Sequence, residues 1–324
     1  SVQLLRNELD LLYQGETTGL SVQLPDLPVS YLEFSQAQRE NLEGERLKAL
    51  KNYWLSALDG APVLSSFPPD RERSARFSRK SGNLTTKLDQ DFSGSLHRFC
   101  RRERVTPFSL MFSVFRLLLA RHSGQDDLVI GTPVLGRNHE DLENLIGCFL
   151  GTIHLRLQID QEATFRDTLK QVQDGNLDAF AYGDLPFEQL VETVRPERSL
   201  LLAPVFQVLF NFFTANRTGF ALGDLEVTPV ELEDLEAKYD MTVYVSDEAD
   251  GIRIRVVYNA SLYEAATMRV LTEQYIGLLE AVLADPERRL SDYTLKAETA
   301  DRLLVESLKP LSRPFKVPVN RHFV

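Results

Sequence analysis

The side chains that could carry chemistry are few and widely spaced in this sequence. Five histidines stand at positions 97, 122, 139, 154 and 322, and none has a neighbour at the spacing that metal ligands need. His139, followed by two acidic residues, is typical of a polar loop or a helix start. His154 falls on the polar positions of an alternating segment, which predicts a surface-facing or sheet-paired ring. No metal site is therefore expected.

Sequence patterns for phosphate binding and for a serine nucleophile are also missing. The chain has no GxxxxGK[ST] loop, no GxGxxG turn and no GxSxG elbow. The common nucleotide-binding sites and the hydrolase elbow are therefore not expected.

Charge and composition narrow the class of protein further. The net charge of −11 argues against nucleic acid as the main partner, because phosphate binding needs a basic face. No stretch approaches the roughly 18 apolar residues of a membrane span, and residues 1–15 do not have the pattern of a signal peptide. Cys100 and Cys148 are too few for a disulfide framework. These features predict a cytoplasmic protein without a membrane span.

The elements that must position any site are helices and strands in irregular alternation. Helices are expected at 1–14, 36–58, 107–124, 165–180 and 268–282, and strands at 127–134, 153–159, 205–210 and 252–258. Residues 16–30 are expected to be a connector, and residues 61–82 a long exposed loop. Because strands and helices mix without regular βαβ repetition, a layered α/β sandwich is favoured over a barrel.

Four motifs in a fixed order carry the strongest functional signal. They are YLEFSQAQRE (31–40), VIGTPVLGRNHEDLENLIGCFLGTIHLR (129–156), GDLPFEQLVETVRPERS (183–199) and PVFQVLFNF (204–212). In content, order and spacing they resemble the core motifs of the condensation domains of nonribosomal peptide synthetases. Gly151 replaces the asparagine that usually precedes Thr152. The resemblance covers about residues 1–296.

This resemblance implies a chloramphenicol-acetyltransferase-like two-layer α/β sandwich. Residues 31–296 would be the C-terminal lobe, residues 1–30 the end of the N-terminal lobe and the connector, and residues 297–324 an interdomain linker. The family's catalytic His-His-x-x-x-Asp-Gly motif does not occur in the sequence and is expected immediately before Ser1. No catalytic residue is therefore assigned in this chain, which alone is expected to be inactive.

The residues of the second motif are expected to hold the backbone in shape. Thr132 and Pro133 are expected to lie in a turn that ends the buried strand predicted at 127–134. Arg137 offers five donors in a rigid fork, which suits either bridging of loop carbonyls or a carboxylate, or a direct substrate contact.

The third and fourth motifs and one later acid have alternatives of the same kind. The resemblance also implies a substrate tunnel between the two lobes, with a donor side and an acceptor side. Pro186 is expected as the first residue of a helix and Phe187 as an inward-packing residue, which either docks the lobe or forms a wall on the acceptor side of that tunnel. Asn211 follows a strand expected to be central, and it would either tie neighbouring backbone or line the tunnel. Asp240 is expected to be a turn or surface acid.

The reaction implied by the resemblance is attack of an acceptor α-amine on a donor thioester, which forms an amide bond. No cofactor would bind directly, because phosphopantetheine arms arrive on the partners, the donor and acceptor peptidyl carrier proteins. Adjacent synthetase domains, with an adenylation domain downstream, are the other expected partners. Arg101 and Arg102, in the basic run 98–104, would help to dock an acidic carrier. The alternatives are a degenerate, non-catalytic domain that recruits carriers or a tailoring enzyme, and a stand-alone acyltransferase.

Overall fold

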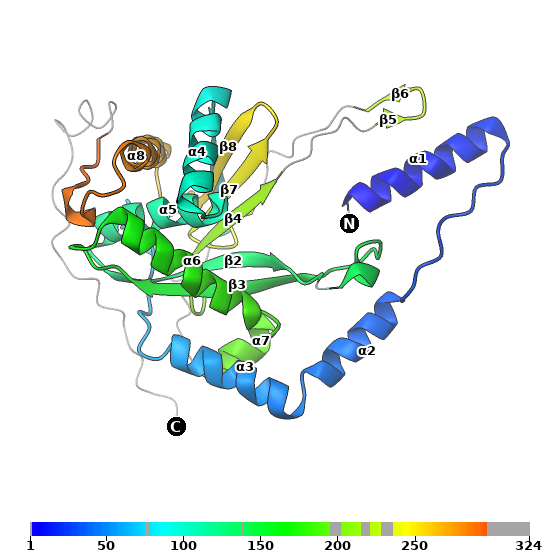
Figure 1. Cartoon of the computed structure of the whole chain (residues 1–324), viewed down its shortest axis with the longest axis horizontal. Helices are drawn as coiled ribbons and strands as arrows, with labels where there is room; N and C mark the ends of the chain where they lie inside the picture. Colours follow the sequence, from blue (N-terminus) through cyan, green and yellow to red (C-terminus); the bar gives the residue numbers. More distant parts are fainter. Residues whose placement is uncertain are drawn as a thin grey trace.

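A six-stranded mixed sheet forms the centre of the computed structural model (Figure 1). The structure describes residues 2–74, 78–137, 139–194, 202–214, 221–227 and 236–296. The strand order is β1-β8-β7-β4-β2-β3, in which β2, β4 and β7 run parallel and the other neighbours are antiparallel. The strands are β1 Ser81–Leu88, β2 Asp127–Leu135, β3 Leu150–Gln158, β4 Val208–Thr214, β7 Met241–Glu248 and β8 Gly251–Asn259, with a separate hairpin of β5 Ala221–Leu222 and β6 Leu225–Glu226.

Helices surround this sheet unevenly. They are α1 Val2–Thr18, α2 Tyr31–Asn41, α3 Gly44–Ala57, α4 Gln90–Glu103, α5 Pro107–Ser123, α6 Phe165–Ala181, α7 Phe187–Val194 and α8 Ala265–Ala284, with short 3₁₀ turns η1 Glu140–Leu142 and η2 Leu290–Asp292. None of the helices in the described ranges combines the length and apolarity needed to cross a membrane.

The main core lies between one face of the sheet and helices α4, α5, α6 and α8. Helix α5 is buried at every position from Ser109 to Ala120, as its nearly continuous apolar sequence predicts. Its Phe115 ring contacts Phe210 of β4 with the centroids 5.3 Å apart. Tyr275 of α8 donates a hydrogen bond of 2.8 Å to the Met111 carbonyl. The central helix is thus held by both the sheet and its neighbour.

Helices α3 and α7 cover the opposite face of the sheet only at β2 and β3. Arg156 of β3 forms an ion pair of 2.7 Å with Asp127 of β2 and donates to the Asp59 carbonyl just beyond α3. On the same face of β7 and β8, Tyr244 and Arg255 stay partly exposed. Among the described residues, this second face therefore has a covered half and a half that is open to solvent.

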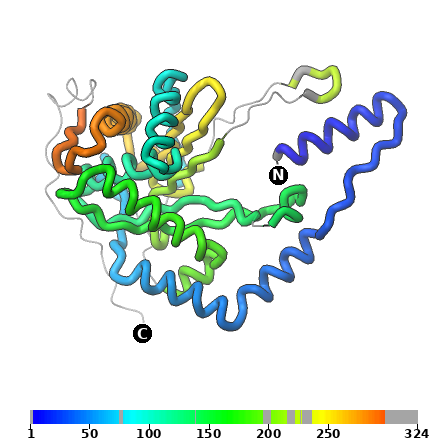
Figure 2. Tube along the Cα trace, in the orientation of Figure 1, coloured from blue at the N-terminus to red at the C-terminus, as the bar shows by residue number. Residues whose placement is uncertain are grey.

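Helices α1 and α2 project away from the sheet at one end of the molecule (Figures 1 and 2). The β5–β6 hairpin lies beside α1, where the Gly223 N–H donates to the Asp10 carboxylate at 2.9 Å. Leu5, Leu9 and Leu12 on α1 keep 56%, 47% and 43% of their surface exposed. Within the described part of the chain, the apolar face of α1 has no close-packed partner.

Most predicted elements are confirmed, and the exceptions have local causes. The helix expected at 36–58 is two helices, because α2 ends at Asn41 and Gly44 takes a positive φ of 57°. The helix expected to stop at Gly15 continues to Thr18 and ends before Gly19, whose φ is 70°. Residues 297–324, expected to be a linker, lie outside the described residues.

Strand β2 also differs from the prediction, because Gly131 and Pro133 do not end it. The strand continues to Leu135, paired with β3 along its whole length. It pairs with β4 only at Gly131. Beyond that residue β2 has a free side, where a proline without an N–H is tolerated. Thr132 and Pro133 therefore lie within the strand rather than in a turn.

Candidate functional site

The first two sequence motifs meet at the far end of the β2–β3 hairpin. The Tyr31 hydroxyl of α2 donates to the Cys148 carbonyl at 2.8 Å, and the Phe34 and Phe149 rings lie 4.6 Å apart. The Arg137 guanidinium stacks 4.1 Å from the centre of the Phe149 ring and donates a hydrogen bond to the Leu142 carbonyl. Arg137 thus ties the loop after β2 to the strand that follows it.

The second, third and fourth motifs meet at His154 on the covered face of the sheet. Its ring is 2% exposed and stacks on Phe187 of α7 at 5.5 Å. Trp54 and Phe206 contact the ring at 5.7 and 5.2 Å. Neither ring nitrogen has a hydrogen-bond partner in the described part of the chain, and burial lowers the pKa of His154 to about 3. His154 is therefore a neutral core residue of an aromatic cluster.

Gly131 explains how that cluster fits against the sheet. A Cβ atom at this position would lie 2.4 Å from the Phe206 ring. The missing side chain lets Phe206 lie directly on the strand. Pro186 stands one residue before α7, and its carbonyl accepts the Leu190 N–H at 2.9 Å, so the helix begins at Phe187 rather than at the proline.

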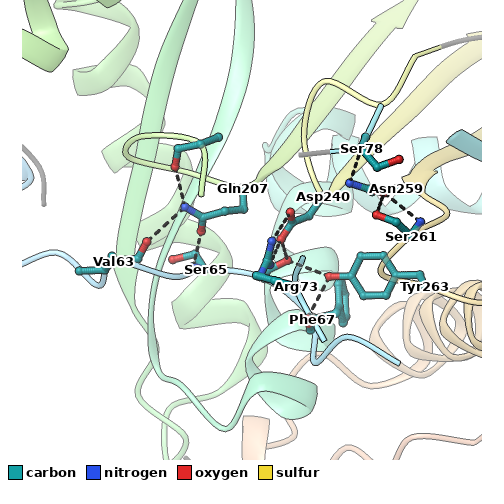
Figure 3. Close-up of polar contacts among 12 residues, drawn as sticks. Val63, Ser65, Phe67, Arg73, Ser78, Gln207, Asp240, Asn259, Ser261 and Tyr263 are labelled. Carbon is teal, nitrogen blue, oxygen red and sulfur yellow. Dashed lines mark hydrogen bonds and ion pairs between the residues drawn. The ribbon is translucent and has the colours of Figure 1, made fainter. Parts of the chain in front are cut away.

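A buried polar network runs along the edge of the sheet where β1, β2, β4 and β7 begin, here called the strand-start edge (Figure 3). Asp240 accepts two hydrogen bonds from the Arg73 guanidinium, and it accepts a third, 2.7 Å long, from the Ser66 hydroxyl. Arg73 and Asp240 are only 5% and 3% exposed. Burial opposes the charge on Arg73, but its bonds to Asp240 outweigh this and raise its pKa above the ordinary value. The network holds residues 63–73 against the sheet.

Gln207 extends the strand-start edge toward β2. Its amide nitrogen donates to the carbonyls of Val63 and Ala203, and its oxygen accepts the Ser65 N–H at 2.7 Å (Figure 3). The Ser65 hydroxyl in turn accepts the Val129 N–H of β2. Every polar atom of this fully buried amide is thereby satisfied, which is the arrangement of a structural residue.

The open half of the second face carries a row of polar side chains. The row crosses four neighbouring strands and consists of Asn211 on β4, Tyr244 on β7, Arg255 on β8 and Thr85 on β1. Each of these residues is paired in register with the next one. All of these side chains are at least partly exposed. In the described part of the chain the Arg255 side chain forms no ion pair, and its buried Nε has no hydrogen-bond partner. The row presents hydrogen-bonding groups and one positive charge to whatever occupies this face.

The last turn of α4 carries the basic residues. Arg101 is exposed, whereas Arg102 pairs with Glu103 at 2.8 Å and lies 5.0 Å from the Phe99 ring centre. These residues lie on the helical side of the sheet, away from the polar row of the second face.

The order and identity of these motifs match a known family. A family model of the condensation domain matches residues 1–305. The chain belongs to the condensation-domain family.

Two curated relatives of this condensation domain are nonribosomal peptide synthetases. Malpinin synthetase of Mortierella alpina is 35% identical over 312 residues, which cover 95% of this chain and 4% of that protein. Gramicidin S synthase 2 of Brevibacillus brevis is 31% identical over 301 residues, which cover 92% of this chain and 7% of that protein. The condensation domain thus spans a small fraction of each relative's length.

Solved structures support the same assignment. The X-domain from teicoplanin biosynthesis superposes with a TM-score of 0.79 at 25% identity, covering 91% of this chain and 68% of that chain. The predicted chloramphenicol-acetyltransferase-like α/β fold is thereby confirmed.

Two predictions about single residues of the condensation domain are wrong, and a third is only half right. Asp240 is a buried acid in an ion pair and not a turn or surface acid. Of the two settings predicted for His154, the surface-facing one is wrong, because α3 and α7 cover its side of β3, whereas the sheet-paired one is confirmed by its pairing with Gly131. Asn211 lies within β4 and not after it, since the strand begins only at Val208, beyond a positive φ of 70° at Val205. The loop at 61–82, expected to be exposed, is fully buried around Ser65.

Sequence reasoning did not single out three residues that matter to this arrangement. Gln207 carried a usable signal, a polar amide in the middle of the apolar run PVFQVLF. Arg73 looked like one of several arginines in a basic loop, and Arg255 like the polar position of an alternating strand. In the described ranges no group of three or more metal-ligating side chains occurs, and His97 and His122 bond to Asp247 and Gln274.

Proposed function

We propose that this condensation domain takes part in forming an amide bond between a donor acyl or peptidyl thioester and an acceptor aminoacyl thioester. Both substrates would be carried on phosphopantetheine arms of carrier proteins, so the domain itself would hold no resident cofactor. The observation that carries the proposal is the match of the condensation-domain model over residues 1–305. The family's chemistry is peptide bond formation in nonribosomal synthetases.

The residues of this chain would contribute positioning rather than proton transfer. Attack of an amine on a thioester is favourable once the two groups are held together, so orientation can supply much of the rate. His97, His122, His139 and His154 all have local partners or a buried aromatic setting. From the family resemblance, we place the catalytic histidine in a His-His-x-x-x-Asp-Gly motif outside this sequence, where it would act as a base or stabilise the tetrahedral intermediate.

The test is amide formation by the natural full-length protein with loaded donor and acceptor carriers. Mass spectrometry of the acceptor arm should show the condensed product, and replacing the second histidine of the expected motif should abolish it. The coding sequence before Ser1 should contain that motif intact. Failure of the full-length protein to form product, with carriers loaded and the motif intact, would contradict the proposal.

A second candidate is a non-catalytic domain that recruits a carrier or a tailoring enzyme. The observation that favours it is the likeness to the X-domain from teicoplanin biosynthesis, which has also been solved in complex with OxyB. A degenerate histidine motif together with retained carrier or enzyme binding in pull-downs would support this candidate over catalysis.

The basic turn of α4 is the proposed contact for an acidic carrier protein. Arg101 should contribute more than Arg102, because Glu103 already neutralises part of the Arg102 charge. We expect Arg101→Glu to weaken carrier affinity several-fold at low salt, and the loss should shrink as salt is raised. The control is Lys170→Glu, which makes the same charge change at an exposed position of α6. Equal carrier affinity of the two variants in titrations at low salt would refute the assignment.

A further inference from the structure

We infer that Arg255, with Tyr244 and Asn211, forms a recognition site for a carboxylate group of the carrier-bound substrate. The inference rests on the proposed function, because it concerns which substrates the domain accepts. The three side chains lie side by side on the open half of the second face, on β8, β7 and β4.

The register of the sheet brings these groups within reach of one ligand. Tyr244 and Arg255 are directly opposite each other, as are Arg255 and Thr85. Cross-strand neighbours of this kind have Cβ atoms about 5 Å apart, so a phenol, a guanidinium and a hydroxyl point the same way from adjacent strands. The alternate residues, Val243 and Ile254, face the buried core, so Arg255 faces away from it.

The charges around Arg255 leave it uncompensated. Arg253, two residues earlier on the same face, is paired with Glu248 at 3.0 Å. Lys87 of β1 is paired with Asp250. In the described ranges, no carboxylate bonds to Arg255, and its Nε is buried without a hydrogen-bond partner. A buried donor of this kind is costly to leave unsatisfied, which favours an acceptor supplied from outside.

A carboxylate is the ligand that this arrangement suits. Guanidinium presents paired N–H donors that match the two oxygens of a carboxylate, and the resulting charge-assisted bonds are stronger than neutral ones. Tyr244 and Asn211 can donate to the same oxygens or to a neighbouring carbonyl. The site would therefore select a donor or acceptor residue that carries an acidic group over its neutral amide counterpart.

The experiment measures binding without requiring turnover. The probes are pantetheine amides of aspartate and asparagine, each made with a free α-amine to mimic the acceptor and with an N-acetyl group to mimic the donor. Dissociation constants are measured by calorimetry on the natural full-length protein and on two variants. R255Q removes the proposed contact. R253Q makes the same substitution on the same strand and face, at an arginine that already has a partner.

We expect the wild type to bind the aspartyl probe about tenfold more tightly than the asparaginyl probe in one of the two probe series. The series that shows the preference identifies the acceptor or the donor as its source. R255Q should abolish the preference and R253Q should retain it. The absence of any preference, the absence of saturable binding, or a preference that survives in R255Q would each overturn the inference. An Arg255-dependent preference in a protein that forms no amide would contradict the proposed function alone.

Discussion

Neutralising Asp240 should destabilise the strand-start edge more than any surface charge change. Asp240→Asn keeps the size of the side chain but leaves Arg73 charged and 5% exposed, without its counter-ion. Removing one member of a buried ion pair costs about 3–5 kcal/mol, because the remaining charge is desolvated and unpaired. The asparagine can still accept one hydrogen bond, so the lower end of that range, about 3 kcal/mol, is expected.

Native-state hydrogen exchange of the natural full-length protein is the suitable assay, because it reports local opening in a large protein. The informative amides are those of Asp240 and Asn259, which bond to the Gln207 and Asp240 carbonyls at 3.0 and 2.9 Å. A loss of about 3 kcal/mol corresponds to exchange on the order of 100-fold faster. The control is Arg79→Met, which breaks the exposed Arg79–Glu236 pair and should cost less than about 1 kcal/mol.

A double variant separates the charge effect from packing. Arg73→Met with Asp240→Leu removes both charges, and it should cost less than Asp240→Asn alone, since no unpaired ion remains. The reasoning is refuted if Asp240→Asn and Arg79→Met change the exchange rates equally, or if the double variant is the least stable of the three.

Three further variants test the packing of the covered face and the hairpin end. Burial lowers the pKa of His154 to about 3 in the folded protein, so below about pH 6.5 the unfolded state binds a proton at His154 more readily than the folded state does. The contribution of His154 to the free energy of unfolding is therefore complete above about pH 6.5 and falls as the pH drops toward 3. In denaturant titrations, the free energy of unfolding of His154→Leu should fall by about 2 kcal/mol less between pH 7 and pH 5 than that of the wild type, and an equal fall in both proteins would contradict this. Gly131→Ala should destabilise the fold by about 1–3 kcal/mol, because the new methyl group would clash with the Phe206 ring. The control Gly175→Ala should stabilise the fold, because this helical position has no neighbouring atom closer than 3.6 Å to the new Cβ. Equal melting temperatures of the two variants would argue against the close approach of Phe206 to Gly131. Arg137→Ala should lower the melting temperature along with turnover, and a normally melting variant without turnover would point instead to a substrate contact.

The elements predicted correctly from sequence are those whose pattern depends on one local environment. The apolar run of α5 correctly predicted that this helix is buried, and the alternation from Ile252 to Tyr258 correctly predicted which residues of β8 face the core. A similar alternation in β3 suggested a surface position for His154. That part of the prediction failed because β3 is covered on both faces there, so a polar position in the pattern is not an exposed one.

The remaining features depend on contacts between distant parts of the chain. Asp240 looks like a turn acid until Arg73, 167 residues earlier, is brought beside it. The start of β4 could not be placed either, because a β-branched residue with positive φ at Val205 has no sequence signal of its own. Local periodicity predicts single helices and strands, whereas an ion pair between residues far apart in the sequence can be recognised only once the fold has brought them together.

The pairing of β1 with β8 has a consequence for how the protein is made. Ser81 pairs with Asn259 and Leu88 with Ile252, so the one neighbour of β1 in the described sheet is a strand that the ribosome delivers much later. At the usual rate of about 5–20 residues per second, β1 waits on the order of 10 seconds or more for that partner. Pairing over such a separation also carries a high loop-closure cost, which slows folding. During synthesis the early half of the domain therefore presents an unpaired strand, and a chain terminated before β8 would keep it as an open edge for aggregation.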